Sequence, residues 1–197
     1  QTCALPISLI WLKERAGGNP TNLAAWKPNV DHWAFGVGAI LGTMEGGIIF
    51  NMKGVVMLEL PGPRLLLIMK ANLLAIMPQL EDANAEGTFL AVVDLDFGRG
   101  TLSIGFSVDF SIDPIVEIFI PIEAYFNLKK GGDWHVYLGT FPGNDLMGRP
   151  MPGPIHAKVL FVFDGSGYVM VSGHGIPAYK GLSSVNGVAL AVGLEVG

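Results

Sequence analysis

The residues from Thr101 to Asp113, TLSIGFSVDFSID, alternate strictly between large apolar side chains and small or polar ones. The apolar members are Leu102, Ile104, Phe106, Val108, Phe110 and Ile112. Successive side chains of a β-strand point to opposite faces, so a period of two places every large apolar side chain on one face. The segment therefore predicts a long amphipathic strand, roughly 40 Å in length if unbroken.

The same period of two is present in the preceding segment, TFLAVVDLDFGRG. One face of this segment is formed by Phe89, Ala91, Val93, Leu95 and Phe97. Gly98-Arg99-Gly100 follows, and a short glycine-containing connection of this kind is typical of a hairpin turn. We predict a β-hairpin over Phe89–Asp113.

Further strands are predicted along most of the chain. They begin at Trp33 and include Gly47–Leu60, Arg64–Leu74, Ile115–Leu128, Trp134–Gly139, Ile155–Phe163 and Tyr168–Ser172. Pro61-Gly62-Pro63 and Asp164-Gly165-Ser166-Gly167 indicate hairpin turns between neighbouring strands. The two strands around Pro61-Gly62-Pro63 are apolar on both faces, which indicates burial on both sides. Pro121, in the middle of its strand, indicates a sheet edge or a bulge.

Helices have little support in this sequence. Leu9–Ala16 can form the end of one helix, closed by Gly17-Gly18, and Ala71–Leu80 can alternatively form a short one. We therefore predict an all-β fold, an antiparallel meander of long amphipathic strands and hairpins with at most one short N-terminal helix. The strands would form a curled sheet, a sandwich or an open barrel that hides their apolar faces.

Two loops are distinctive in composition. QLEDANAE is acidic, and we predict that it is solvated. Gly139–Pro154 contains four prolines and four glycines. Loops above about 12 residues are often functional or disordered, although a simple connection is the plainer interpretation of this one.

Composition excludes several classes of protein. Half of the 197 residues are apolar and only 15% are charged, with a mean hydropathy of +0.47, which excludes a disordered chain. The formal net charge of −5 and the lack of a basic stripe argue against a nucleic-acid partner. No stretch approaches the roughly 20 apolar residues of a transmembrane helix, so none is predicted.

The first seven residues, QTCALPI, match the translation of a common sequencing-adapter oligonucleotide, CAG ACG TGT GCT CTT CCG ATC. We interpret residues 1–7 as a non-native segment, which removes any redox, metal or disulfide role from Cys3, the single cysteine. Residues 8–32 are predicted to be a linker or the end of a preceding element. Residues 33–197 are predicted to be a β-rich domain, a truncated internal fragment of a longer protein from an assembled environmental read.

Four pieces of the sequence occur in a characteristic order: HWAFGVGA, GVVMLELPGPRLLLIMKANLL, FLAVVDLDFGRGTLSIGFSVDFSI and DWHVYLGTFPG. This order resembles the uncharacterised bacterial family called domain of unknown function sixty-six-oh-three. The shared features are a Pro-flanked Arg64 before an apolar strand, the Asp-Phe-Gly-Arg-Gly hairpin and the Gly-Thr-Phe-Pro strand exit. The resemblance covers Trp33 to Gly175. It implies a β-rich fold within a very large Gly-rich chain, whose flanking domains would be partners, and it implies no activity.

Acidic residues are the first candidates for chemistry. Asp94 and Asp96 lie two residues apart on one strand face, where such a pair can bind a divalent cation, but the solvated face of a strand beside a turn is the simpler interpretation. Glu117 and Glu123 share a face but lie about 20 Å apart along it. A glycosidase pair requires about 5–10 Å, so these two glutamates do not form one.

Histidine, serine and glycine motifs give no stronger signal. His32, His135, His156 and His174 fall in four separate segments without the spacing of metal ligands. GSG and SGHG lack the strand–elbow–helix context of a hydrolase serine. Gly36–Gly42, GVGAILG, has the wrong spacing for a dinucleotide-binding loop and is better interpreted as small residues in a tightly packed strand. We expect no catalytic, cofactor-binding or metal-binding residues, and no cofactor.

Three functions remain open. The first is a non-catalytic structural or binding β module. The second is a groove for lipid or another hydrophobic ligand, or a membrane-associated β-sheet, so that the partner would be a lipid or a protein. The third is a hydrolase with an unassigned site, which requires His135 and His156 to converge with Asp94 or Asp96. Separations above about 10 Å would exclude that version.

Overall fold

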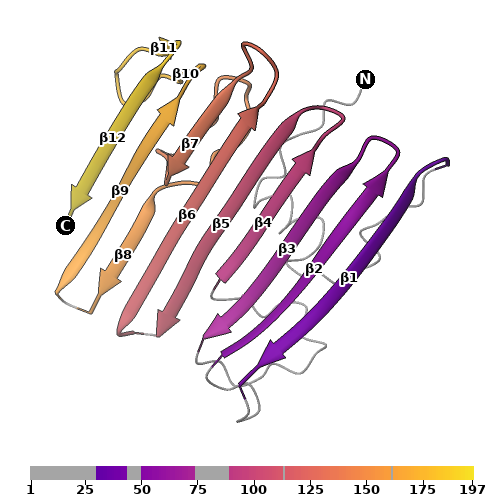
Figure 1. Cartoon of the computed structure of the whole chain (residues 1–197). Helices are drawn as coiled ribbons and strands as arrows, with labels where there is room; N and C mark the ends of the chain where they lie inside the picture. The colour runs from indigo at the N-terminus through magenta and orange to yellow at the C-terminus, as the bar shows by residue number, and fades with distance from the viewer. Residues whose placement is uncertain (1–29, 44–49, 74–88, 113, 161) are drawn as a thin grey trace. The chain divides into compact units, whose positions relative to one another are not determined.

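The computed structural model of the chain describes residues 30–43, 50–73, 89–112, 114–160 and 162–197 (Figure 1). In these residues the regular secondary structure consists of strands, and none of them is helical. The strands are β1 (Trp33–Gly42), β2 (Phe50–Leu60), β3 (Arg64–Leu73), β4 (Phe89–Asp96), β5 (Thr101–Ile112), β6 (Val116–Asn127), β7 (Trp134–Leu138), β8 (Ile155–Val159), β9 (Phe163–Ser172), β10 (Gly175–Ile176), β11 (Val185–Asn186) and β12 (Ala189–Val196).

Ten of these strands form one antiparallel sheet in the order β1-β2-β3-β4-β5-β6-β7-β9-β12, with β8 paired to both β6 and β9. β10 and β11 form a separate two-stranded sheet. The predicted all-β, antiparallel fold is confirmed. The predicted helix at Leu9–Ala16 and the acidic loop QLEDANAE lie outside the described residues. Of the alternative helix at Ala71–Leu80, the first three residues belong to β3 and the others lie outside the described residues.

Contacts within the chain divide it into two compact units, Gln1–Phe106 and Ser107–Gly197, with the boundary inside β5. In unit 1 the first four strands form a meander: β1 pairs with β2, β2 with β3 and β3 with β4. The turn Pro61-Gly62-Pro63 joins β2 to β3, and residues 97–100 join β4 to β5, where the Gly100 N–H donates to the Asp96 carbonyl at 2.8 Å. Both predicted hairpins are confirmed.

The register separates the side chains of unit 1 into two faces of different chemistry. Phe35 lies opposite Leu58, and Leu65 lies opposite both Leu58 and Leu95, so these positions share one face. We call it the apolar face of unit 1, and it consists of Trp33, Phe35, Val37, Ala39, Leu41, Phe50, Met52, Gly54, Val56, Leu58, Leu60, Leu65, Leu67, Met69, Ala71, Phe89, Ala91, Val93 and Leu95. Every ionisable side chain of β1 to β4 lies on the opposite face.

The apolar face of unit 1 is more exposed to solvent than the opposite face, which is the reverse of what hydrophobicity alone predicts. On the apolar face Val37 is 75% exposed, Val56 44% and Leu65 39%. Asp94 and Asp96, on the opposite face, are only 8% exposed. The predictions that the sheet hides its apolar faces and that β2 and β3 are buried on both sides are therefore wrong in unit 1. The glycines of Gly36–Gly42 do lie in a strand, but β1 is exposed along its whole length and is not tightly packed.

In unit 2, β7 and β8 occupy a single lane of the sheet between β6 and β9 (Figure 1). On β9, Leu138 of β7 lies opposite Val169 and Ile155 of β8 lies opposite Gly167. On β9 only Tyr168 lies between these two partners, and Gly139 is the residue that takes the position opposite it. The register therefore continues from residue 139 to residue 155 without interruption, as in one strand. Residues 140–154 leave the sheet between these two positions, and we call them the excursion.

Pro121 lies where β6 changes its partner in this lane. β7 pairs with β6 as far as Ile122, and β8 pairs with it from Phe119. The Pro121 carbonyl accepts the Gly139 N–H at 2.8 Å. Proline has no N–H to donate to a ladder, and it is accommodated here because the chain leaves the lane at this point. Its position is therefore neither the sheet edge nor the bulge that the sequence suggested.

The predicted hairpin turn at Asp164-Gly165-Ser166-Gly167 is wrong, because these residues belong to β9. The turn falls earlier, since Val159 at the end of β8 already lies opposite Phe163. The glycines are needed for close packing inside the strand. A Cβ on Gly165 would lie 2.6 Å from the Phe163 ring, and one on Gly167 would lie 3.0 Å from the Gly193 carbonyl oxygen.

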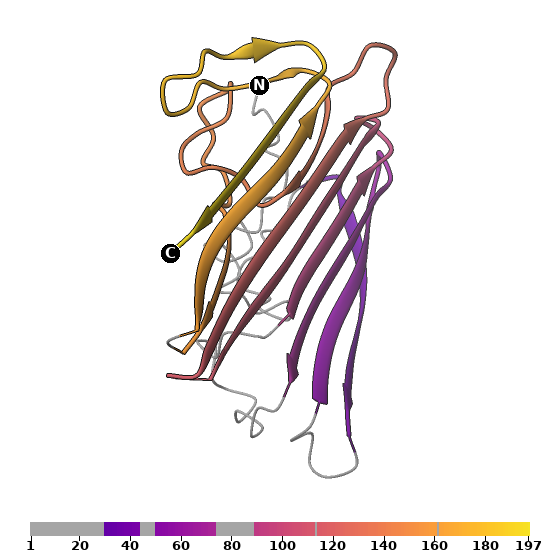
Figure 2. The ribbon, with the colours of Figure 1, turned by 90° about the vertical axis from the view of Figure 1, so that its left-hand side faces the viewer.

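Two segments cover one face of unit 2, the excursion and residues 173–188, which we call the C-terminal cover. They lie together at one end of the unit (Figure 2). The core of unit 2 forms beneath them, where Phe141 of the excursion and Ile176 of the cover pack with Tyr137, Met170 and Ala189. Met170 is completely buried.

The opposite face of unit 2 is apolar. We call it the apolar face of unit 2, and its side chains are those of Val116, Ile118, Ile120, Ile122, Ala124, Phe126, Trp134, Val136, Leu138, Ile155, Ala157, Val159, Phe163, Val169, Val171, Leu190, Val192, Leu194 and Val196. Val192 is 64% exposed and Leu194 81%. All ionisable side chains of β6 to β9 and β12 lie on the covered face, so unit 2 repeats the arrangement of unit 1.

Candidate functional site

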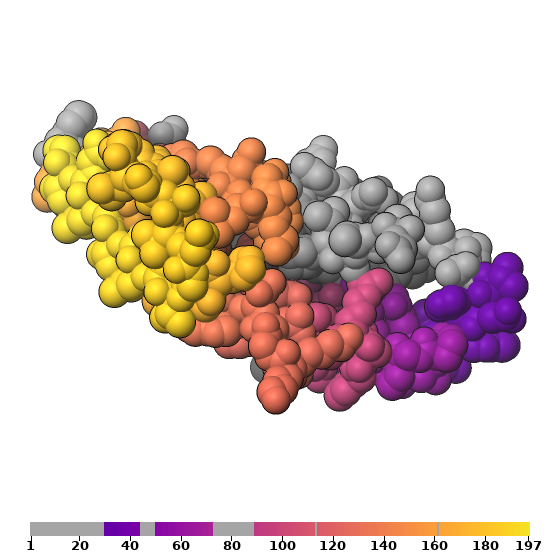
Figure 3. Space-filling model, turned by 90° about the horizontal axis from the view of Figure 1, so that it is seen from above, coloured from indigo at the N-terminus to yellow at the C-terminus, as the bar shows by residue number. Residues whose placement is uncertain are grey.

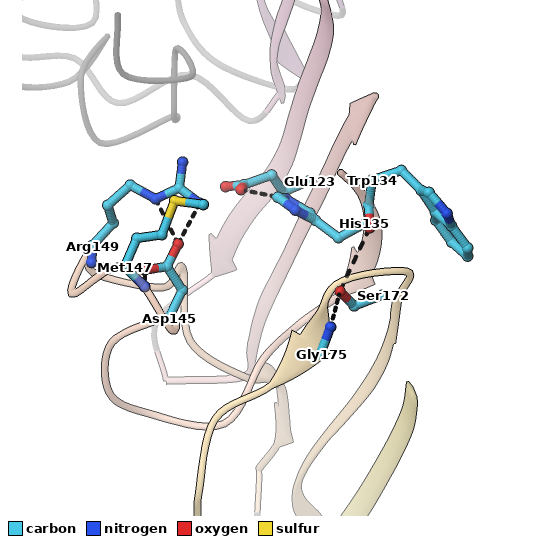
Figure 4. Close-up of polar contacts among 8 residues, drawn as sticks. All are labelled: Glu123, Trp134, His135, Asp145, Met147, Arg149, Ser172 and Gly175. Atoms are coloured by element: carbon cyan, nitrogen blue, oxygen red, sulfur yellow. Dashed lines mark hydrogen bonds and ion pairs between the residues drawn. The ribbon is translucent and has the colours of Figure 1, made fainter. Parts of the chain in front are cut away.

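A polar cluster lies on the covered face of unit 2, and it contains two residues that the sequence singled out (Figure 4). Glu123 of β6 and His135 of β7 are brought together, with His135 Nε2 2.9 Å from Glu123 Oε1. The imidazole stacks on the Tyr137 ring at 4.2 Å between centroids. His135 is only 8% exposed. A carboxylate and a stacking ring thus fix this histidine in one orientation.

Tyr137 and Ser172 form the next part of the cluster. Burial raises the pKa of Tyr137 to about 12, and a hydrogen bond with Ser172 acts in the opposite direction. The Ser172 oxygen also accepts the backbone N–H groups of His174 and Gly175, at 3.1 and 3.2 Å. Ser172 therefore closes the turn into the C-terminal cover, and its oxygen is engaged in that turn.

The excursion brings an ion pair toward this cluster (Figure 4). Asp145 pairs with Arg149, and its Oδ1 accepts the backbone N–H groups of Met147 and Arg149 at 2.9 and 2.8 Å. An aspartate that bonds to the backbone a few residues ahead stabilises a tight turn. Asp145 therefore shapes the tip of the excursion, which also carries the bridge between Asn144 and Pro150.

The geometry of this cluster does not form a nucleophile–base pair. The lone pairs of Ser172 accept backbone N–H groups, and His135 is bonded to Glu123. His135 lies opposite Tyr125 and His156 opposite Phe119, six residues along β6, which is about 20 Å. This separation excludes the convergence of His135 and His156 that the hydrolase hypothesis requires. Within the described ranges, no group of three His, Cys, Asp or Glu side chains could hold a metal ion.

Asp94 and Asp96 lie on one strand face as predicted, but this face is buried and each carboxylate has its own arginine. Arg64 Nε and Nη2 donate to the two Asp94 oxygens at 2.7 and 3.0 Å, and Nη1 lies 3.3 Å from Glu59. The hydrogen bond with Asp94 raises the pKa of Arg64 above its ordinary value. Asp96 accepts the Arg99 backbone N–H at 2.8 Å. The prediction of a solvated aspartate face is wrong, because these pairs allow burial of the charges.

The remaining candidates are dispersed over the surface. His156 contacts Asp164 at 3.2 Å, and His174 contacts Asp133 at 2.9 Å. His32 contacts the carbonyl of its neighbour Val30 at 2.9 Å. Cys3 lies outside the described residues.

A pocket that the sequence did not predict lies within unit 2, beside the core. It has a volume of about 180 Å³ and is lined by Pro142, Pro154, Ser166, Gly167, Tyr168, Tyr179, Lys180, Gly193, Leu194 and Glu195. The excursion, β9, β12 and the C-terminal cover all contribute to it. Figure 3 shows the yellow C-terminal residues adjoining the orange ones in this unit. The high proline and glycine content of Gly139–Pro154 drew attention to the excursion, but neither this signal nor the predicted strand Tyr168–Ser172 indicated a pocket between Tyr168 and Tyr179.

Comparison with known proteins gives no relative: no family model, no curated protein and no solved structure matches the chain. The resemblance to domain of unknown function sixty-six-oh-three stays a prediction. In the part of the chain that the structure describes, no helix has the length and apolar character needed to cross a membrane.

Proposed function

We propose that this chain is a non-catalytic β module that binds lipid hydrocarbon on the apolar faces of its sheet. The observation that carries the proposal is the segregation of charge. In β1 to β4 of unit 1, and in β6 to β9 and β12 of unit 2, every ionisable side chain lies on one face, and the other face is apolar and carries many of the exposed large hydrophobic residues.

Hydrocarbon fits these faces better than protein does. Protein interfaces carry about one hydrogen bond per 100–200 Å², and they are only about as apolar as the rest of the surface. The strand positions of these faces offer almost no side-chain donor or acceptor. Exposed apolar patches above a few hundred Å² mark interaction sites, and burial of such a surface contributes roughly 25 cal/mol per Å².

The dimensions of the strands also support a lipid partner. β2 has 11 residues and β3 has 10, which corresponds to about 33–36 Å. The hydrocarbon core of a bilayer is about 30 Å thick, and an acyl chain spans about half of it. One strand therefore presents apolar side chains over the full length of a lipid tail.

Flotation with phosphatidylglycerol vesicles tests the proposal by two matched pairs of variants. Val37→Lys and Val192→Lys place a charge on the two apolar faces, whereas Val30→Lys and Val188→Lys place it at exposed positions outside the strands. A lysine near the middle of a lipid-facing surface is costly. We expect at least about tenfold weaker vesicle binding for Val37→Lys and Val192→Lys, and less than twofold change for the controls.

Circular dichroism confirms that each variant is folded. Equal vesicle binding by all four variants would show that the apolar faces are not the binding surface. A folded wild-type chain that neither floats with vesicles nor carries lipid in a native mass spectrum would contradict the proposal, and would favour a structural module that packs against another protein layer.

A further inference from the structure

We propose that the pocket in unit 2 binds an organic ammonium group, of which a quaternary ammonium such as choline is the best-fitting kind. This inference does not rest on the lipid-binding proposal, because the tyrosines and the charged residues that line the pocket lie outside the apolar face of unit 2. In the absence of ligand, the ammonium group of Lys180 occupies the position that the ammonium group of the ligand would take.

Aromatic rings form the walls of the pocket. Tyr168 and Tyr179 are nearly perpendicular, with an angle of 87° and 6.3 Å between their centroids. Phe141 stacks behind Tyr179 at 4.3 Å, so the Tyr179 ring is held in place and has one free face. Tyr168 meets this stacked pair edge-on and lies nearer to Phe141 than to Tyr179, so the π surface that is open to a cation is the free face of Tyr179.

The protein's own ammonium group lies over the Tyr179 ring. Lys180 Nζ lies over the Tyr179 ring, 5.6 Å from its centroid, and 3.9 Å from Glu195 Oε2. Lys180 and Glu195 are the two charged residues that line the pocket. Once Lys180 moves away, Glu195 leaves a net charge of −1 beside the free face of an aromatic ring, which favours a cation.

A tight turn positions Lys180 so that a ligand can replace its side chain in the pocket. Tyr179 and Leu182 form two backbone hydrogen bonds with each other, of 3.1 and 2.9 Å, and Lys180 and Gly181 both have positive φ, 45° and 86°. A two-residue turn of this kind fixes the backbone. The Lys180 side chain is nevertheless 67% exposed, so it can leave the pocket for water while Tyr179 stays in place.

The shape of the pocket favours an alkylated ammonium over an inorganic cation. Pro142, Pro154 and the tyrosine rings offer carbon surface, and about 180 Å³ is enough for a trimethylammonium group with its attached carbons. Methylated ammonium is weakly hydrated and can contact such walls on several sides. The ligand source can be a soluble amine or the headgroup of a choline lipid, since both present the same chemistry.

Titration of choline chloride, followed by two-dimensional amide NMR of the full chain, tests the inference. We expect saturable shifts at Tyr179, Lys180 and Glu195, and at least tenfold weaker binding of 3,3-dimethylbutanol, the neutral isostere of choline. Glu195→Gln should weaken choline binding at least fivefold, whereas Lys180→Ala should strengthen it about threefold or more. Glu117→Gln and Lys158→Ala, at exposed positions away from the pocket, serve as matched controls and should change it less than twofold.

Equal binding of choline and its neutral isostere would overturn the inference and leave a merely apolar pocket. Unchanged choline affinity in both Glu195→Gln and Lys180→Ala would overturn it as well. Phosphatidylcholine vesicles identify the source of the ligand: Glu195-dependent binding to them indicates a lipid headgroup, and binding of free choline alone indicates a soluble amine. Failure of vesicle flotation with choline binding intact would reject the lipid-binding proposal and leave this one standing.

Discussion

At the scale of single residues, the stability of the fold is most sensitive to substitution of the paired charges on the buried face of unit 1 and the covered face of unit 2. Arg64 binds Asp94 through two parallel hydrogen bonds, 2.7 and 3.0 Å long, and contacts Glu59 more loosely at 3.3 Å. Planar two-point pairing of this kind is both stronger and more directional than a single contact. Removal of one partner leaves the other charge poorly solvated.

We expect Asp94→Asn to lower the free energy of unfolding by about 2 kcal/mol, because Arg64 then keeps its charge without its main acceptor. Glu59→Gln is the matched control and should cost less than about 1 kcal/mol, since this pair is longer and more exposed. Urea unfolding followed by circular dichroism measures both. Equal losses in the two variants would show that the Asp94 contact has no special role.

Tyr137 gives a prediction for alkaline pH. Its pKa is about 12 in the folded chain, mainly because of burial, whereas the unfolded chain ionises a tyrosine near pH 10. Between these values the folded state binds more protons, so the stabilisation is complete below pH 10 and is lost as pH rises to 12. We expect wild type to lose about 2 kcal/mol over this range beyond any loss in Tyr137→Phe, measured by urea unfolding at pH 9, 10 and 11.5. Parallel curves for the two proteins would contradict this.

At the scale of elements, the excursion and the C-terminal cover depend on each other through a few aromatic side chains. Phe141 stacks on Tyr179 at 4.3 Å and meets Tyr168 edge-on at 5.6 Å, and it is only 3% exposed. Phe141 therefore connects the excursion, the cover and β9 at one place. Loss of its ring leaves a cavity that three elements share.

We expect Phe141→Ala to destabilise unit 2 by about 3–5 kcal/mol, as large-to-small substitutions of buried aromatic residues do. Hydrogen exchange should accelerate in both the excursion and residues 173–188, while β2 and β3 in unit 1 keep their protection. Phe97→Ala is a control in an exposed turn, since Phe97 is 60% exposed. Faster exchange confined to the excursion would show that the two covering segments are independent.

Sequence periodicity predicts the strands of this chain better than it predicts their burial. The pattern of Thr101–Asp113 identified β5 correctly, because alternation follows directly from strand geometry. Alternation does not say which face is covered, and here the face with Asp94 is the buried one. Glycine was equally ambiguous: Gly100 does lie in a turn with φ of 69°, whereas Gly165 and Gly167 lie inside β9. The pocket could not be predicted, because its tyrosines come from segments that only the fold brings together.

At the scale of the whole molecule, the apolar faces of the two units carry no charged side chain of their own in β1 to β4, β6 to β9 and β12, so a net charge of −5 gives these faces little protection in water. An exposed apolar sheet face promotes association unless another surface covers it. Solvent composition should therefore control the association state of the chain more strongly than ionic strength does.

We expect the purified chain to self-associate in detergent-free buffer and to become monodisperse in a mild non-ionic detergent, with bound detergent detectable by sedimentation equilibrium. Salt between about 0.05 and 0.5 M should change the association little, because the surface involved is uncharged. A chain that is monomeric without detergent and takes up none would contradict this prediction.

The continuous register on either side of the excursion has a consequence for the history and the engineering of this sheet. Gly139 and Ile155 occupy neighbouring positions in one lane, so the number of residues between them changes no strand pairing on β6 or β9. An insertion or a replacement here lengthens only the covering layer. The segment between these two residues can therefore be replaced by one of another length or sequence without a change in the pairing of any strand. Such a replacement would give the same sheet a different covering segment, and with it a different ligand specificity.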